Sequence, residues 1–216
     1  MPKKGIAIAA LGAVLILSAL LLFLHNRQED IRAGQEAESL VQRVEAEIRE
    51  KAQTVPPAET TAETQPEEEV IETEPPEMPV TVLNGYGYIG YLEIPAQWLK
   101  LAVMSEWDYN RLRLSPCRQC GTTYGDDLVI AAHNYDSHFG RLKNLNPGDL
   151  VTFTDMDGVV NTYSVTEIDT VSPESVDAVL HSGHDLVLYT CTKGGKTRVT
   201  VFCDRAERAG EETAEP

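Results

Sequence analysis

A cysteine and an arginine near the C-terminal end of the chain lie where a β-hairpin would bring them together. Cys191 lies in a run of β-branched and aromatic residues, Leu186–Thr192, and Arg198 lies in another, Thr197–Phe202. The pair Gly194-Gly195 between them is typical of a two-residue hairpin turn. With that turn Cys191 pairs with Arg198, and directly opposed residues have Cβ atoms roughly 4.5–5.5 Å apart.

Such a pair has a definite chemistry. A cation close to a thiol favours the thiolate, which is the nucleophilic form of cysteine. The same guanidinium would stabilise the negatively charged oxygen that forms when the thiolate attacks a carbonyl group. The hairpin therefore predicts nucleophilic catalysis by Cys191, supported by Arg198.

A cysteine nucleophile also needs a group that moves protons. The chain has five histidines: His25, His133, His138, His181 and His184. His133 follows the apolar run Leu128–Ala132, which predicts a buried strand. A polar residue at the exit of such a strand is held by the core yet open to a cleft, and this favours His133. A structural histidine at a strand end is the commoner alternative.

The other cysteines have different expected roles. Counted along the hairpin, Cys203 lies opposite Leu186 and on the other face from Cys191, so we expect a buried thiol that leaves Cys191 unpaired. Cys117-Arg118-Gln119-Cys120 is expected in a loop, as a structural disulfide or a reduced pair. A zinc site is weakly supported because no second ligand pair at zinc spacing is present.

The N-terminal region reads as a membrane anchor. Gly5–Leu24 is an uncharged apolar run, and about 20 such residues can cross a bilayer as a helix. Lys3 and Lys4 favour a cytoplasmic N-terminus. A cleaved signal peptide is the alternative, but the run is long for one and no small-residue cleavage site follows. We expect residues 1–25 to form a single-pass anchor in the cell membrane, with the remainder extracellular.

Two segments connect this anchor to the folded part. Helical spacing of apolar residues predicts a juxtamembrane helix over residues 26–53. These apolar residues are Leu40, Val41, Val44 and Ile48. We interpret the helix as a solvated stalk, with a partner-binding helix as the alternative. Residues 54–80 are rich in Pro, Glu and Thr, which predicts a disordered acidic linker.

Residues 81–205 are the predicted catalytic domain, and residues 206–216 a flexible tail. The chain has a formal net charge of −16. Residues 26–80 carry fifteen acidic and five basic side chains, and residues 81–205 carry fifteen and ten. Without a basic stripe to meet phosphates, nucleic acid is excluded as a partner.

The domain reads as a mainly β structure. Short runs of strand-forming residues are separated by turn signals, which suggests a sandwich or a barrel. The expected strands are 86–94, 99–104, 127–132, 150–154, 159–168, 186–192 and 197–202. Short helices are expected within 108–112, 138–145 and 174–180.

Three features together resemble the sortases, membrane-anchored cysteine transpeptidases of Gram-positive cell surfaces. They are Leu188-Tyr189-Thr190-Cys191, an arginine on the next strand, and Ala132-His133-Asn134 after an apolar strand. The family signature is Thr-Leu-x-Thr-Cys with a downstream arginine and an upstream histidine. This chain has Val187 at the first position, where we expect an effect on packing rather than on chemistry. The resemblance extends from about Tyr88 to Asp204.

The resemblance implies a closed eight-stranded β-barrel with short helices, preceded by the transmembrane helix and the acidic stalk. It makes Cys191 the nucleophile, His133 the general acid/base and Arg198 the stabiliser of oxyanion and substrate. Thr190 would shape the substrate groove. The implied reaction cleaves the Thr–Gly bond of an LPXTG-like sorting signal of a surface protein through a thioacyl-enzyme. An amine acceptor, either a peptidoglycan precursor or a pilin lysine, then takes the acyl group.

The family mechanism requires no metal and no organic cofactor. Some relatives bind calcium, for which the loop acids here are Asp126, Asp127, Asp155 and Asp157. Exposed acids in turns more often serve solubility, since Ca²⁺ needs six or more convergent oxygens. The short segment between Ile168 and Asp185 argues against the long helical insertion of class B sortases. The lack of a C-terminal membrane segment argues against a typical pilin-polymerising class C enzyme.

Two alternative functions stay open. One is another surface cysteine peptidase or transpeptidase that uses the same thiol. The other is a non-catalytic anchored β-module, in which Cys191 is an inert core thiol.

Overall fold

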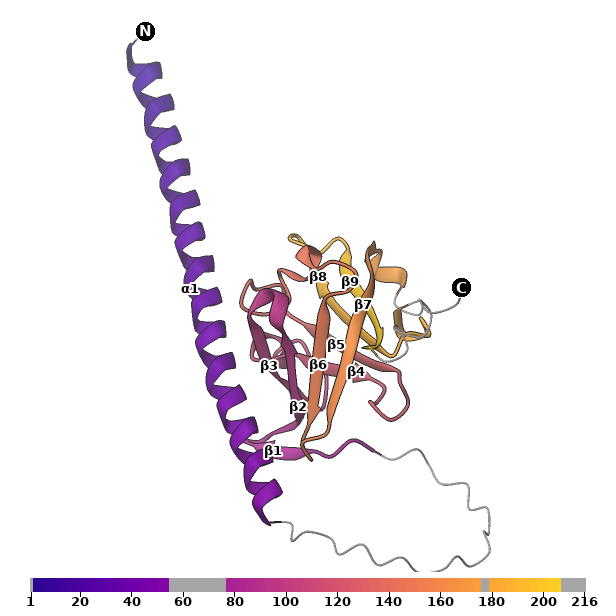
Figure 1. Cartoon of the computed structure of the whole chain (residues 1–216). Helices are drawn as coiled ribbons and strands as arrows, with labels where there is room; N and C mark the ends of the chain where they lie inside the picture. Colours follow the sequence, from indigo (N-terminus) through magenta and orange to yellow (C-terminus); the bar gives the residue numbers. More distant parts are fainter. Residues whose placement is uncertain (1, 55–76, 176–178, 207–216) are drawn as a thin grey trace, which may run out of the picture.

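A computed structural model of the chain describes residues 2–54, 77–175 and 179–206. One long helix, α1 (Pro2–Thr54), lies beside a barrel of β-strands (Figure 1). The expected acidic linker at 54–80 lies largely outside the described residues, as does most of the expected tail at 206–216.

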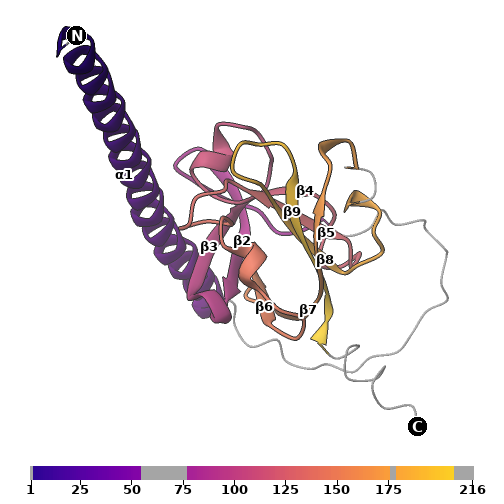
Figure 2. The same ribbon diagram turned by 90° about the horizontal axis from the view of Figure 1, so that it is seen from above.

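The strands close into a ring. Among the described residues they are β1 (Thr81–Leu83), β2 (Tyr86–Ile94), β3 (Leu99–Met104), β4 (Cys117–Cys120), β5 (Leu128–Ala132), β6 (Leu150–Asp155), β7 (Val160–Val171), β8 (Leu186–Cys191) and β9 (Arg198–Arg205). Their order is β2-β3-β4-β5-β8-β9-β7-β6, and β6 pairs with β2 to close the barrel (Figure 2). β1 pairs with the start of β2 outside this ring. The expectation of a closed eight-stranded barrel is confirmed.

A glycine allows the ring to close. Gly90 has φ +145°, and a Cβ there would collide with the Thr154 carbonyl of β6. The β2–β3 register also shifts at this point, between Tyr88 and Gly90. Only a residue without a side chain lets the two backbones approach this closely.

Apolar side chains at alternate positions along the strands fill the barrel interior. Side chains of β5, β8 and β9 point inward at every second position, and those facing the interior are buried apolar groups such as Ile130, Leu188 and Val201. The other face carries a smaller cluster around Val129 and Val187. Burial of one strand face fixes the register of each pair, because a slip by one residue would turn the apolar set outward.

The strand β4 corrects the expectation of a loop at Cys117–Cys120. It pairs antiparallel with β5, with a bulge between Arg118 and Cys120. The strand is short and contains the polar residues Arg118 and Gln119, so the sequence does not show a strand pattern here. Cys117 and Cys120 pack into different apolar clusters and both are free thiols.

The expected short helices at 108–112 and 138–145 are single 3₁₀ turns, and so is the start of the one expected at 174–180, of which residues 176–178 lie outside the described residues. They are η2 (Arg111–Arg113), η3 (Leu142–Asn144) and η4 (Pro173–Ser175), and a further turn, η1 (Pro95–Gln97), follows β2. Each lies in a connection between strands. These turns are therefore parts of loops and do not form a helical layer on the barrel.

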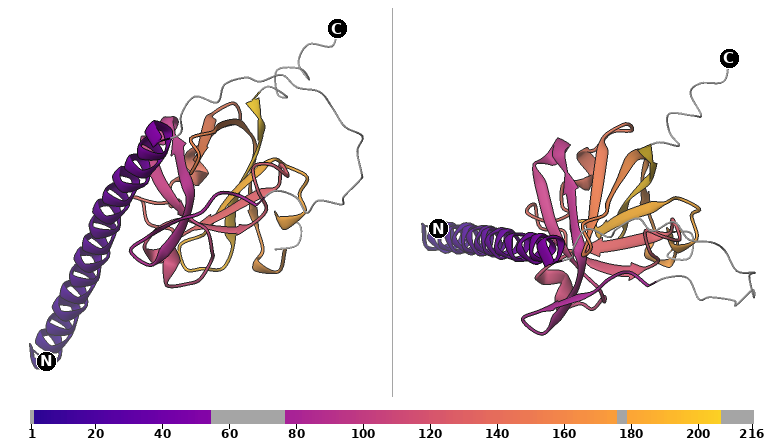
Figure 3. Two further views of the ribbon diagram at one scale, coloured as in Figure 1. Left: turned by 90° about the horizontal axis from the view of Figure 1, so that it is seen from below. Right: turned by 60° about the horizontal axis from the view of Figure 1, so that its bottom comes forward.

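Helix α1 continues through both the apolar run and the segment after it. Its N-terminal part projects beyond the barrel with exposed apolar side chains, and its C-terminal part lies along β2 and β3 (Figures 1 and 3). An 18-residue window of this helix has a mean hydropathy of 2.8, so its length and composition suit a membrane span.

One face of α1 packs against the barrel. We call it the docking face; its buried or bonded members are Asp30, Ala33, Ala37, Val41, Val44, Glu45 and Lys51. Val44 is fully buried against the cluster that contains Tyr88 and Met104. Glu45 pairs with Lys100 at 2.6 Å. The apolar face noted in the sequence therefore packs against the barrel of the same chain.

Candidate active site

The parallel pair β5–β8 sets the geometry of the candidate site. The strands run in register from Leu128 opposite Leu186 to Ala132 opposite Thr190. His133 and Cys191 are the next residues of the two chains, so they leave the barrel side by side at the same rim. Neighbouring strands lie about 4.8 Å apart. The structure therefore brings together two residues that are 58 positions apart in the sequence.

Thr190 holds this rim. Its hydroxyl donates a hydrogen bond of 2.8 Å to the carbonyl oxygen of Ala132, and both residues are buried. The bond joins the residue before the candidate nucleophile to the residue before the candidate base. Thr190 therefore stabilises the pairing of β5 with β8 at the site. Its expected role in shaping a substrate groove stays a prediction.

The pairing of Cys191 with Arg198 is confirmed. The expected two-residue turn is not formed. Instead the Thr192 amide donates to the Thr197 carbonyl at 3.0 Å, and the Gly195 amide donates to the Thr192 carbonyl at 2.8 Å. The two threonine hydroxyls also lie 2.9 Å apart, so their hydrogen bonds close a four-residue loop and leave the register of Cys191 unchanged.

Arg198 is oriented by the loop that follows Cys191. Its Nη1 donates to the carbonyl oxygens of Gly195 and Thr197, each at 3.1 Å. A guanidinium has five N–H donors, so these bonds leave others available for a substrate oxygen. The bonded loop fixes the position of the positive charge on the strand beside Cys191.

Tyr189 lies beside the same strand pair. Its hydroxyl donates to Oε1 of Gln119 at 2.9 Å. Burial raises the pKa of Tyr189 to about 12, while Arg198 acts to lower it and Cys191 to raise it further. Tyr189 is therefore a neutral hydrogen-bond donor close to both candidate catalytic groups.

The four cysteines differ sharply in environment. Cys191 is exposed, whereas Cys117 and Cys203 are fully buried. Cys203 lies opposite Leu186, as expected. Burial raises the pKa of the Cys117 thiol to about 12 and that of the Cys203 thiol as well. Both buried groups are protonated and unreactive at neutral pH. Cys120 is partly buried, and Cys191 is the exposed thiol.

His133 is half-buried and stacks on an aromatic ring. The ring centroids of His133 and Tyr135 are 3.9 Å apart. Burial lowers the pKa of His133, with a smaller contribution from Arg113, so the imidazole is neutral at neutral pH. Within the described residues its Nδ1 has no hydrogen-bond partner. This Nδ1 is itself buried. A neutral imidazole can accept a proton from a thiol.

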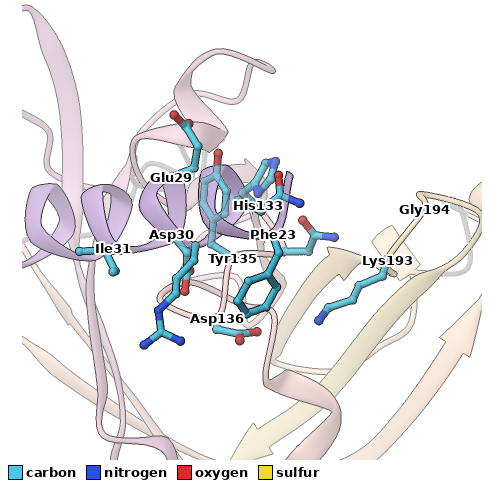
Figure 4. Close-up of a pocket in the computed structure, with 12 residues that line it drawn as sticks. Phe23, Glu29, Asp30, Ile31, His133, Tyr135, Asp136, Lys193 and Gly194 are labelled. Carbon is cyan, nitrogen blue, oxygen red and sulfur yellow. The ribbon is translucent and has the colours of Figure 1, made fainter. Parts of the chain in front are cut away.

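A cavity of about 800 Å³ opens beside His133, between the barrel rim and helix α1 (Figure 4). The helix supplies one wall, and the hairpin loop approaches from the other side. The lining residues are Phe23, Asn26, Arg27, Glu29, Asp30, Ile31, His133, Asn134, Tyr135, Asp136, Lys193 and Gly194. Figure 4 shows the rings of His133 and Tyr135 beside the helix. The volume of the cavity is in the range of ligand pockets. Of the three candidate catalytic residues, His133 lines the cavity, whereas Cys191 and Arg198 are not in its lining.

Hydrogen bonds fix the helix to this rim. Asp30 accepts bonds from the amide and the hydroxyl of Ser137, each at 3.0 Å. The Ser137 hydroxyl also lies 3.0 Å from the Asp30 carbonyl. These bonds place the negative charge of Asp30 beside the loop that carries His133.

The sequence did not identify Tyr135 or the helix as parts of the site. Tyr135 follows His133 by two positions, as expected of a neighbour on the same face of an extended segment, and this spacing was the available signal. Asp30 and Phe23 carry no local signal, because only the packing of α1 brings them to the rim.

The loop acids named as calcium candidates have other partners. Asp126 pairs with Arg205 at 2.6 Å, and Asp157 lies 3.5 Å from Lys51. Asp127 and Asp155 each accept backbone amide bonds within their own turns. In the part of the chain that the structure describes, no three His, Cys, Asp or Glu side chains gather as a metal site.

Comparison with known families identifies the family of the chain. A family profile for the sortase domain matches residues 92–206, which is more than half of the chain. The chain belongs to the sortase family. The strands β5, β8 and β9, and the loop between β8 and β9, lie inside the matched region. A comparison with curated protein sequences gives no match.

Solved structures with similar folds carry the same family name. Sortase C1 from Streptococcus suis is 25% identical, covers 55% of this chain and 72% of its own, with a TM-score of 0.48. A Clostridium perfringens sortase D5 transpeptidase is 22% identical, with coverages of 58% and 82% and a TM-score of 0.49. Sortase C from Clostridium perfringens SM101 is 21% identical, with coverages of 80% and 90% and a TM-score of 0.48.

A second histidine near the site predicts a pH effect on stability. His138 is fully buried, and burial, reinforced by His133, lowers its pKa to about 4. The unfolded chain binds a proton at His138 below a pKa of about 6.5, whereas the folded chain stays neutral until about 4. Folding should therefore be weakened by about 3 kcal/mol through His138 as the pH falls from 7 to 4.

Urea unfolding at several pH values checks this expectation. The variant His138→Phe, which cannot be protonated, should lose about 3 kcal/mol less stability over this range than the natural chain. His184→Phe is the matched control, because His184 is half-exposed and paired with Asp204. Equal pH dependence in the natural chain and His138→Phe would contradict the assignment.

Proposed function

We propose that this sortase is a cysteine transpeptidase that cleaves an LPXTG-like sorting signal and transfers the cleaved protein to an amine. The register of β5 with β8 carries the proposal, because it puts His133 next to Cys191 at one rim. The exposure of Cys191 supports the role of nucleophile and argues against an inert core thiol.

In the first step, the sulfur of Cys191 attacks the carbonyl carbon of the Thr–Gly bond, and the thiol proton passes to the neutral imidazole of His133. The lowered pKa of His133 keeps the imidazole ready to accept this proton. When the C–N bond breaks, the imidazolium returns the proton to the leaving amine. A thioester between Cys191 and the threonine carbonyl remains.

In the second step, an amine attacks the thioester. His133 accepts a proton from the attacking nitrogen, the C–S bond breaks, and Cys191 leaves as a thiolate that takes this proton from the imidazolium. The acceptor amine belongs to a peptidoglycan precursor or to a pilin lysine. Both steps pass through a tetrahedral oxyanion, which Arg198 would stabilise with donors not used by Gly195 and Thr197.

The membrane anchor fits this reaction. The apolar part of α1 would hold the enzyme in the cell membrane with the N-terminus in the cytoplasm and the barrel outside. Surface proteins that carry a sorting signal would meet the enzyme there after export. The proposed partners are therefore the sorting-signal protein, the acceptor amine and the membrane lipid.

The nucleophile is tested by paired cysteine variants. Cys191→Ala should abolish both cleavage of a sorting-signal peptide and formation of the thioacyl-enzyme, which mass spectrometry of the intact protein detects. Cys203→Ala should leave both intact, because Cys203 is buried on the opposite strand face. Thioester formation in Cys191→Ala would refute the assignment.

The acid/base role is tested by paired histidine variants. His133→Ala should lower kcat by about 10²–10⁴-fold, the usual contribution of a positioned proton-transfer group. His184→Ala should stay near the natural rate, because His184 is bonded to Asp204 at the base of β8. Normal turnover by His133→Ala would transfer the role to another group.

The oxyanion role is tested by Arg198→Lys. A lysine keeps the charge but cannot make the two bonds of Nη1 while also reaching a substrate oxygen. We expect a loss of at least about 10-fold in kcat with a smaller change in KM. Lys196→Arg on the same loop is the control, and full activity of Arg198→Lys would contradict the proposed role.

A further inference from the structure

The hairpin loop of the site lies level with the end of the apolar part of α1. Phe23, one residue before the end of the uncharged run, lines the same cavity as Lys193 and Gly194. In Figure 1 the loop between β8 and β9 lies at the end of the barrel nearest the projecting half of the helix. We propose that this end of the barrel binds the surface of an anionic lipid bilayer. The proposal depends on the apolar run crossing the membrane and is independent of the catalytic roles.

The dimensions of a bilayer support this position. The polar layers add roughly 5–7 Å on each side of a hydrocarbon core about 30 Å thick. If the core ends near Leu24, a helix perpendicular to the membrane rises about 1.5 Å per residue beyond it. Ile31, the last helix residue of the cavity, then lies about 10 Å from the core. The cavity and the hairpin loop therefore begin within the headgroup layer.

The position is rigid because the docking face holds the barrel to the helix. Asp30 is bonded to Ser137 close to the membrane end, and Glu45 is paired with Lys100 four turns further along. Val41 and Val44 are buried between these two polar contacts. A barrel attached at several points along one straight helix keeps the same rim toward the membrane.

Basic side chains at this rim match anionic headgroups. Lys193 and Lys196 flank the tip of the hairpin loop and are exposed, as is Lys143 in η3. A basic residue close to an anionic surface strengthens binding about fivefold. The acids Glu29, Asp30 and Asp136 line the cavity and are not at the hairpin tip. Exposed Glu174 follows β7, whose last residue Val171 pairs with Arg198.

An exposed tryptophan lies at the same end. Trp98 is 96% exposed and has φ +52°, an unfavourable backbone conformation for a bulky residue. Its neighbour Gln97 donates to the Arg141 carbonyl at 2.7 Å, and Arg141 Nε donates to the carbonyl of Asp136, which lines the cavity. Gln97, the residue before Trp98, is thus connected to the rim by a short chain of hydrogen bonds. Tryptophan is enriched at membrane interfaces, where its apolar ring and N–H group are both accommodated.

Fluorescence quenching in nanodiscs tests the proposal. The chain has two tryptophans, so Trp107→Phe leaves Trp98 as the single reporter in the full-length protein. In nanodiscs of phosphatidylglycerol and phosphatidylcholine brominated near the headgroup, Trp98 should lose much of its emission and shift to shorter wavelength. Aqueous iodide should quench it less than it quenches the same protein in detergent.

The reciprocal variant is the control. Trp98→Phe leaves Trp107, which packs against the cluster containing Val44, some 30 Å along α1 from Leu24. Its emission should be unaffected by brominated lipid. Trp98 emission that is equally insensitive to brominated lipid, with full access to iodide, would overturn the proposal.

A charge variant tests the role of the lysines. Lys196→Glu should reduce the quenching of Trp98 in anionic nanodiscs, whereas Lys51→Glu, at the other end of the docking face, should not. Unchanged quenching by Lys196→Glu, or equal quenching in purely zwitterionic nanodiscs, would refute anionic lipid as the partner. These measurements use no sorting-signal substrate, so their failure and a failure of the transpeptidase proposal are distinguishable.

Discussion

The parallel pairing of β5 with β8 is the constraint on which the candidate site depends. Parallel neighbours end at the same rim of a sheet, so two residues that follow them in register must emerge together. The bond from Thr190 to the Ala132 carbonyl fixes the last pair of this ladder. The antiparallel pairing of β8 with β9 then adds Arg198 beside Cys191. Closure of the barrel through β2 and β6 prevents these three strands from separating.

Much of this arrangement could be predicted from local patterns. The bounds of β2 and β3 agree with the runs of strand-forming residues, and the register of the last hairpin gave the correct partners for Cys191 and Cys203. These features depend on alternation of apolar residues and on short connections, which a sequence displays directly. The family resemblance supplied the closed barrel, which periodicity alone left undecided between a sandwich and a barrel.

Other features depend on contacts between distant segments, which no local pattern contains. β4 is a strand because β5 pairs with it, although Arg118 and Gln119 interrupt the apolar pattern. The turn after Cys191 differs from the expected one because the threonine side chains on both sides bond to each other. The stacking of Tyr135 on His133 and the wall formed by α1 require the tertiary structure. The apolar spacing of α1 was visible, but the surface that it meets was not.

The continuity of α1 also restricts how the anchor and the barrel can diverge in evolution. Each residue inserted between Leu24 and Asp30 would rotate the apolar anchor by about 100° relative to the docking face and move it about 1.5 Å along the axis. Because all docking residues follow this segment, Val41 and Val44 would keep their contacts with the barrel, and most insertions would instead turn Phe23 away from the cavity. Changes close to a whole number of turns, such as seven residues, would preserve the phase between the anchor and the docking face. The orientation of the anchor relative to the barrel thus depends on the number of residues in this segment through the helical repeat, whereas a flexible tether would impose no such dependence.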